Sequence, residues 1–284
     1  RKPPTMDQSA IVTLSRLAVE AEEANRLDTD TPAVILTNRD GTQHIESIEH
    51  LQPGRSRYRG KYTSNALADF AGYVTRTHEN GLAQGQPQGF IDPANMACAV
   101  FFNLGDGEHA GHADHTASLK LKPTAAYAAL RAALAKAHDQ RSLHDFIEDW
   151  RDAIVPMTAG EPDTTRRIPS VLAAVRSITI DEARSSTHDD RDFGATRSTM
   201  ESVDAKSAHT LPSGLVFRCA PYEGLPGREF RLRLGVSTGA DKLVLVLRMQ
   251  QAEAVEEAIA ADFRAALADK LSTACSLVLG TFTP

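Results

Sequence analysis

Residues 53–78 read PGRSRYRGKYTSNALADFAGYVTRTH and contain the sharpest change of pattern in the chain. A Pro-Gly turn opens the stretch, and basic residues then recur at every second position. From Leu67 onward the apolar residues follow helical spacing, and Ser64 and Asn65 are candidate N-caps. The pattern predicts an extended basic strand or loop that leads into an amphipathic helix ending near Glu79.

The basic run is the first candidate for a contact surface. In an extended strand, four like charges on one face repel one another unless they meet anions. Those anions are carboxylates of another subunit, or phosphates of a nucleic acid whose bases stack on the tyrosines. A third interpretation is an edge strand whose charges prevent aggregation. The candidate contact residues are Arg55, Arg57, Tyr58, Arg59, Lys61 and Tyr62.

Composition restricts the class of protein. The chain has 284 residues, 42% of them hydrophobic, which is enough for an ample core. Its net charge of −6 argues against a surface that is basic throughout and favours the subunit contact for the basic run. The odd number of widely spaced cysteines predicts buried, reduced thiols rather than disulfides; they are Cys98, Cys219 and Cys275.

Targeting signals are the next feature. We find neither an apolar run of transmembrane length nor a signal-peptide pattern. We therefore expect no membrane partner, and a cytosolic location in a host cell or in a particle made there.

The order of elements predicts an α+β fold, with mixed or antiparallel sheets, several amphipathic helices, an N-terminal arm and an extended basic strand or loop. We expect one compact unit rather than independent domains. Its parts are an arm and helix at 1–30, an α+β lobe at 31–156, a helix and charged loop at 157–198, and a β-rich lobe with one helix at 199–284.

Several individual elements have clear signals. The turn at residues 38–41 predicts a hairpin with strands near 33–37 and 42–45. An apolar segment at 97–103 predicts a central strand. The other main expectations are helices at 9–27, 124–137, 142–154, 170–184 and 252–271, and strands near 116–121, 199–204, 214–220, 229–236, 242–249 and 276–282.

A group of imidazoles and carboxylates precedes the expected strand at 116–121. Such side chains at close spacing could bind zinc or a similar ion, but the spacing matches no standard site, and we favour a solvated loop. The candidate ligands are His109, His112, Asp114 and His115.

The usual catalytic motifs are a separate matter. The sequence lacks a nucleophile elbow, a phosphate-binding loop and a dinucleotide fingerprint. We therefore expect a protein that is not an enzyme, with no catalytic residues and no cofactor.

Several motifs in a fixed order resemble one family. They are the pattern P-x-R-x-R-x-R-G and the helix D-F-x-x-Y-V within Pro53–Val74, then Ala99-Val100, Asp114-His115-x-Ala117 and Phe146–Asp149. Together they resemble the YfdQ family of uncharacterised proteins of tailed bacteriophages and prophages, over about residues 32–284. The resemblance implies a phage accessory gene and transfers no catalytic residue.

From these observations we expect a non-enzymatic phage or prophage accessory protein that self-associates into a symmetric homo-oligomer, up to a large shell-like assembly. The alternative is a nucleic-acid-binding accessory factor in phage recombination or replication. A third hypothesis is a metal-dependent hydrolase that uses the histidines at 109–115.

Overall fold

The computed structural model describes residues 11–18, 32–38, 41–178, 211–239 and 242–284. The chain divides into two compact units, unit 1 (Arg1–Gly60) and unit 2 (Lys61–Pro284). This division falls inside the segment that the sequence analysis treated as one lobe. The expected strand at 199–204 and the charged loop before it lie outside the described residues.

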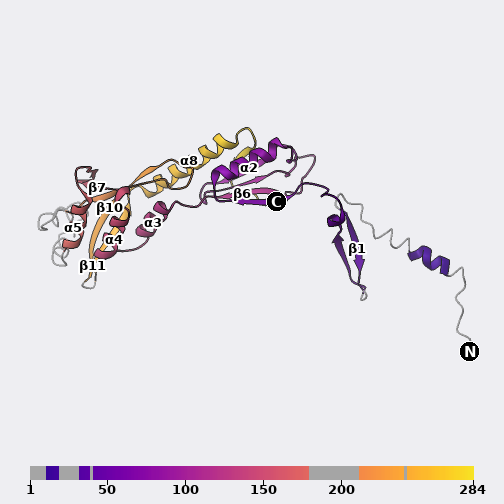
Figure 1. Ribbon diagram of the computed structural model, residues 1–284, viewed down its shortest axis with the longest axis horizontal. Helices are drawn as coiled ribbons and strands as arrows, with labels where there is room; N and C mark the ends of the chain where they lie inside the picture. The colour runs from indigo at the N-terminus through magenta and orange to yellow at the C-terminus, as the bar shows by residue number, and fades with distance from the viewer. Residues whose placement is uncertain (1–10, 19–31, 39–40, 179–210, 240–241) are drawn as a thin grey trace, which may run out of the picture. The chain divides into compact units, whose positions relative to one another are not determined.

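Unit 1 contains a helix at 11–18 and a two-stranded hairpin (Figure 1). Strand β1 (Ala33–Thr37) pairs antiparallel with β2 (Gln43–Ser47), which confirms the expected hairpin. A short 3-10 helix, η1 (Glu49–Leu51), follows. The longer helix expected at 9–27 is confirmed where it is described, and the rest of it lies outside the described residues.

The first sheet of unit 2 has the strand order β12-β4-β5-β6-β3. Neighbours β4, β5 and β6 are antiparallel, whereas β12 joins β4 in parallel. The apolar strand β5 is central, as predicted. The strands are β3 (Gly60–Ser64), β4 (Gln88–Asp92), β5 (Ala97–Phe101), β6 (His115–Lys120) and β12 (Ser276–Leu279).

Two helices contact this sheet and each other (Figure 1). They are α2 (Leu67–Glu79) and α8 (Ala252–Leu271), and the bounds predicted for α8 are confirmed. The proposed N-caps of α2 are wrong, because Ala66 is the N-cap and makes no side-chain cap bond. Ser64 is the last residue of β3, and its hydroxyl instead accepts the Ala66 backbone N–H at 3.1 Å.

The second sheet of unit 2 is antiparallel, with the strand order β11-β10-β9-β7-β8. Its strands are β7 (Ile154–Thr158), β8 (Glu161–Pro162), β9 (Gly214–Cys219), β10 (Arg228–Gly239) and β11 (Lys242–Met249). Helices from the middle of the chain pack on it: α3 (Ala125–Leu134), α4 (Gln140–Asp149) and α5 (Ile168–Ser177).

Predicted helix ends in this region are wrong. The helix expected at 170–184 ends at Ser177, and the backbone of Ile178 is extended. The sequence analysis extended the helix at 142–154 through Ile154, but α4 ends at Asp149 and Ile154 begins β7. Ile154 pairs with Phe217 of β9, and its buried side chain joins the core from a strand. Ile154 fits the spacing of an apolar helix face and also that of a buried strand, and periodicity alone does not distinguish the two.

A single hydrophobic core extends through both sheets of unit 2. Helix α8 contributes Phe263 and Leu267, which are fully buried. It is also joined to β10 by Arg228, whose Nη2 donates to Asp262 Oδ2 at 2.6 Å. Because one core serves both sheets, residues 61–284 form one unit.

The distribution of elements fits an α+β fold, because the helices do not alternate with parallel strands. The expected fold class is confirmed. Among the described helices, none combines the length and the apolar character needed to cross a bilayer.

Candidate functional site

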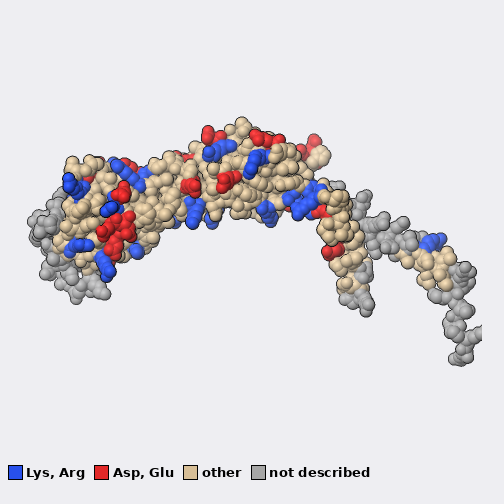
Figure 2. All heavy atoms as spheres, in the orientation of Figure 1, with Lys and Arg blue, Asp and Glu red and all other residues tan. Residues whose placement is uncertain are grey.

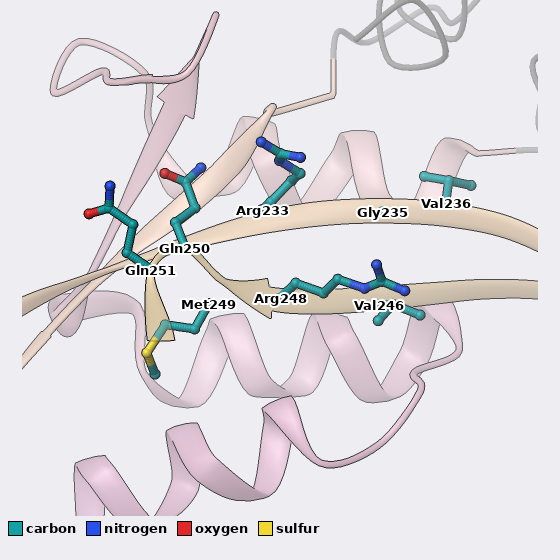
Figure 3. Close-up of a pocket in the computed structure, with 8 residues that line it drawn as sticks. All are labelled: Arg233, Gly235, Val236, Val246, Arg248, Met249, Gln250 and Gln251. Carbon is teal, nitrogen blue, oxygen red and sulfur yellow. The ribbon is translucent and has the colours of Figure 1, made fainter. Parts of the chain in front are cut away.

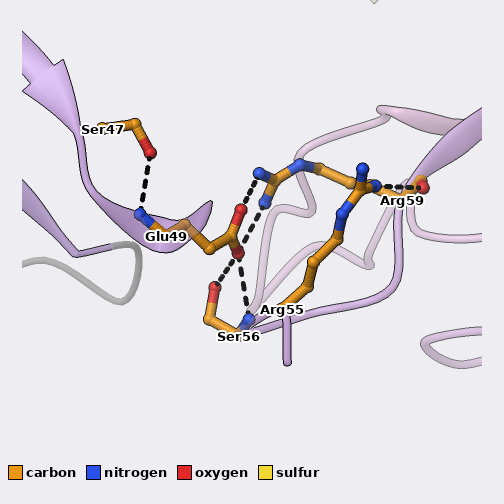
Figure 4. A network of polar contacts seen from close by, with 5 residues as sticks. All are labelled: Ser47, Glu49, Arg55, Ser56 and Arg59. Atoms are coloured by element: carbon orange, nitrogen blue, oxygen red, sulfur yellow. Dashed lines mark hydrogen bonds and ion pairs between the residues drawn. The ribbon is translucent and has the colours of Figure 1, made fainter. Parts of the chain in front are cut away.

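The basic loop of unit 1 is organised around a carboxylate that the sequence analysis missed. Glu49, at the start of η1, is only 7% exposed. Its Oε1 accepts hydrogen bonds from the backbone N–H and the hydroxyl of Ser56, at 3.0 and 2.9 Å (Figure 4). The guanidinium of Arg59 donates to both carboxylate oxygens, with Nη1 3.1 Å from Oε1. We call this group the Glu49 clamp.

The electrostatics of the clamp follow from these donors. The Ser56 backbone N–H, followed by the Arg59 side chain, lowers the pKa of Glu49 from 4.5 to about 2. Hydrogen bonds to the ionised form of a carboxylate have this effect. Glu49 is therefore charged at neutral pH, and its charge is matched by Arg59.

The clamp changes the interpretation of the basic run. Residues 55–59 are not in a strand, so the arginines do not share one face as an extended run would place them. Arg59 is taken by Glu49, and exposed Arg55 donates to the Arg59 carbonyl at 3.3 Å. Arg57 is half-buried and Tyr58 is 51% exposed. We predicted an extended basic strand or loop here, and the structure has a loop up to residue 59 and a strand from residue 60.

The last two residues of the run belong to strand β3 of unit 2. Lys61 is exposed, whereas Tyr62 packs against the core. The ring of Tyr62 stacks on Tyr73 of α2 with a centroid distance of 4.2 Å, and Tyr73 meets Phe102 edge-on. One ring face of Tyr62 is therefore already covered by Tyr73 inside the protein.

A buried polar network lies beside these rings. Asn103, which follows β5, is 1% exposed, and His115, which begins β6, has no exposed surface. The Asn103 side chain accepts the His115 backbone N–H at 3.0 Å and donates to Asp114 Oδ1 at 2.8 Å. The Tyr73 hydroxyl lies 3.5 Å from His115 Nε2. We call this group the Asn103 network.

Burial determines the charge state of this network. Desolvation lowers the pKa of His115 from its usual 6.5, so the ring is neutral at pH 7. A ring with no exposed surface cannot present a base to a substrate in solvent. The network instead fixes the connection between β5 and β6, because its hydrogen bonds join the two ends of that connection.

The candidate metal ligands lie in two different settings in the structure. His109 lies in the exposed connection, where its backbone N–H is accepted by Asp106 Oδ1 at 2.7 Å, and His112 is also exposed. Asp114 and His115 are instead drawn inward to Asn103 and Tyr73. Within the described ranges no three His, Cys, Asp or Glu side chains are grouped closely enough to hold a metal ion.

Burial was predicted for all three cysteines and is confirmed for two of them. Cys98 and Cys275 are buried, and burial raises the pKa of each thiol to about 12. Cys219 is half-buried, with a pKa raised to about 11 by the same cause. Thiols with such pKa values are poor nucleophiles at neutral pH.

The geometry thus defines an α+β protein with a polar clamp in its first unit and a buried histidine network in its second. The chain belongs to the family described as Uncharacterized conserved protein (DUF2303), whose model matches residues 6–282. No curated protein and no solved structure matches it. The resemblance to the YfdQ family and the phage setting stay predictions.

Proposed function

We propose that this chain is a non-enzymatic accessory protein whose task is to associate with further copies of itself. The proposal is carried by one observation on unit 1. In the described part of that unit, which has a helix, a hairpin and a 3-10 helix, no apolar side chain is buried. Regular structure without an apolar core is unusual for a unit that acts alone.

The exposed apolar residues of unit 1 are large. Val12 and Leu14 of the helix at 11–18 are 64% and 52% exposed, Ile45 of β2 is 66% exposed and Leu51 of η1 is 74% exposed. A two-stranded hairpin is marginally stable in water, and so is a helix of this length. Burying one such side chain stabilises by about 1.5–3 kcal/mol. Unit 1 therefore gains most from a protein surface that covers it.

A second copy of the chain is the partner that the composition favours. Unit 2 exposes Val278 and Leu279 on β12, which is the last strand at one edge of its sheet, and Phe282 beyond it. One chain thus exposes apolar side chains both in the described part of unit 1, which buries none, and at a sheet edge of unit 2. Contacts between two different surfaces of the same chain build rings when their rotation closes. The proposed product is a symmetric homo-oligomer, up to a large shell-like assembly.

The biological setting is the less direct part of the proposal. Placing the protein in a phage or prophage, and hence in the host cytoplasm or a phage particle, is supported by the resemblance of the motifs between residues 53 and 149.

Nucleic-acid binding by the basic loop has less support. Arg59 already serves Glu49, and Tyr62 already stacks on Tyr73. On the face of unit 2 drawn in Figure 2, basic and acidic side chains are interspersed. Binding to a polyanion is typically associated with a continuous basic stripe.

Light scattering after size-exclusion chromatography tests the proposal. The full chain should elute as an oligomer at micromolar concentration. Replacing Leu14→Gln and Leu17→Gln together should weaken association by more than about a hundredfold, because two apolar contacts of about 1.5–3 kcal/mol each are lost.

The matched control is Ser15→Gln, which adds the same polar side chain to the same helix. It should assemble as the wild type does. Unit 2 keeps its own core in all three proteins, so their thermal unfolding should coincide in a dilute, monomeric sample. A full chain that stays monomeric, or an assembly that the double replacement leaves intact, contradicts the proposal.

A further inference from the structure

Two arginines lie directly opposite each other on neighbouring strands of the second sheet. Arg233 of β10 and Arg248 of β11 are register partners. Partners in an antiparallel pair have Cα atoms about 4.5–5.5 Å apart, and their side chains project from the same face. Like charges in this position are unfavourable unless an anion lies between or above them.

The other arginines of this face differ in having carboxylate partners. Arg218 of β9 is 2.8 Å from Glu229, and Arg231 of β10 is 3.6 Å from Glu161. Among the described residues, no carboxylate lies within 4.0 Å of Arg233 or Arg248. Among the side chains of this face that the structure describes, the arginines outside this pair thus have a carboxylate partner.

The arginine pair borders a groove. Its volume is about 590 Å³, which falls within the range of about 300–1,000 Å³ that is usual for small-molecule sites. Figure 3 shows Arg233, Gln250 and Gln251 projecting from the same side of the strands, and Arg248 extended along β11 toward Val246. The lining residues are Arg233, Gly235, Val236, Val246, Arg248, Met249, Gln250 and Gln251.

One glycine of β10 lines the groove. Gly235 is the register partner of Val246, and a Cβ there would meet only the Val246 carbonyl, at an ordinary 3.6 Å. At this position of β10 the groove is therefore free of a side chain, next to Val246 of β11.

The end of the groove carries neutral polar groups. Gln250 and Gln251 connect β11 to α8, and Gln251 has a left-handed backbone with φ 52°. This conformation is uncommon for a residue with a side chain and costs energy of the order of 1 kcal/mol. It leaves two amide side chains at the groove beside two cationic side chains, while Val236 and Val246 supply apolar surface.

We propose that this groove binds the phosphate group of a small phosphorylated molecule, held between Arg233 and Arg248. A phosphate monoester carries close to two negative charges at neutral pH, which matches the unpaired charge of the two guanidinium groups. Guanidinium groups recognise phosphate oxygens by paired, charge-assisted hydrogen bonds. The remaining volume, with its amides and valines, accommodates the organic part of the ligand. The site is independent of the proposed self-association.

Isothermal titration calorimetry at low ionic strength tests the site, with inorganic phosphate and AMP as probes. Each should bind the full chain with 1:1 stoichiometry per chain. Arg233→Gln and Arg248→Gln should each weaken AMP binding by at least about tenfold, because each removes one charge-assisted contact. The control Arg218→Gln removes an exposed, paired arginine of the same face and should stay within about twofold.

A third probe, an oligonucleotide without terminal phosphates, separates a phosphate monoester from phosphodiesters. Tighter, length-dependent binding of that probe would overturn the assignment in favour of a nucleic acid. If a variant folds poorly, NMR on the wild-type chain still tests where phosphate binds. Phosphate should shift the backbone amide NMR signals of residues 233, 248 and 250, and shifts confined to other regions would overturn the proposal, as would no binding at millimolar concentration.

Discussion

Unit 1 and unit 2 hold their elements in place by different physical means. In unit 2, helices and two sheets share one apolar core, which includes the fully buried Phe230 and Phe263. In the described part of unit 1, the buried side chain is a carboxylate, Glu49, and its partners are polar. Apolar burial gives unit 2 stability of its own, whereas a polar clamp gives unit 1 shape with little stability. The difference is why we assign the assembly role to unit 1.

The largest expected effect comes from truncating the shared core. Phe263→Ala should lower the free energy of unfolding by about 3–5 kcal/mol, because it removes a buried ring and leaves a cavity. The matched change in unit 1 is Leu51→Ala, which should change it by less than about 0.5 kcal/mol in a monomeric sample. Urea unfolding of both variants measures the contrast. Equal losses would mean that unit 1 has a core of its own.

A smaller effect concerns the pH dependence of unit 2. His115 has a lowered pKa in the folded chain, so below about 6.5 the unfolded chain binds a proton that the folded chain does not. Stability therefore rises with pH in this range and falls as the pH drops through 6.5.

Unfolding curves measured between about pH 7.5 and 5.5 should show this loss, with the slope of at most one proton for this group. His115→Gln should flatten the curve, even though it lowers stability overall. The control His112→Gln changes an exposed histidine of the same connection and should keep the wild-type slope. Parallel slopes for wild type and His115→Gln would show that His115 is not the group responsible.

The smallest effect on global stability is expected in the clamp, where the readout is local. Glu49→Gln removes the charge that holds Arg59, so the loop at 55–59 should open more often and trypsin should cut it faster. Glu46→Gln, which changes an exposed carboxylate of β2, is the matched control and should be cut at the wild-type rate.

The same clamp should also open with acid. The folded pKa of Glu49 is lowered from 4.5 to about 2, so its contribution is present above pH 4.5 and is lost as the pH falls toward 2. Hydrogen exchange of the loop amides across this window is the measurement. If the loop amides of Glu49→Gln exchange at the wild-type rate, Glu49 does not hold this loop closed.

Local signals predicted many elements of the fold. The apolar spacing of residues 252–271 gave the bounds of α8, and the turn at 38–41 located the β1–β2 hairpin. These succeed because helix periodicity and turn chemistry depend on neighbours in the chain. Ile154 failed for the converse reason, since its strand exists only because β9 lies beside it.

The candidate sites were harder to predict from local signals. The basic run was visible, but its partner Glu49 precedes it across a turn, and nothing in the sequence distinguishes Glu49 from the nearby Glu46. Asn103 did carry a weak signal, because it is a polar residue that directly ends an apolar strand. Asp114 and His115 were candidate metal ligands in a segment for which we favoured a solvated loop, and their inward placement depends on Asn103 and Tyr73.

The sequence by itself determined the α+β class, the bounds of its strongest helix and the presence of a basic run in an acidic chain. Only the tertiary structure decided which of those charges are already paired. It drew Arg59 to Glu49 and left Arg233 facing Arg248 across two strands. The reason is physical: periodicity acts over a few residues, whereas the meeting of charges depends on strand register and burial. Within the basic run, Arg59 is thus paired with a carboxylate of its own unit, whereas the arginine pair without a carboxylate partner lies in the second sheet.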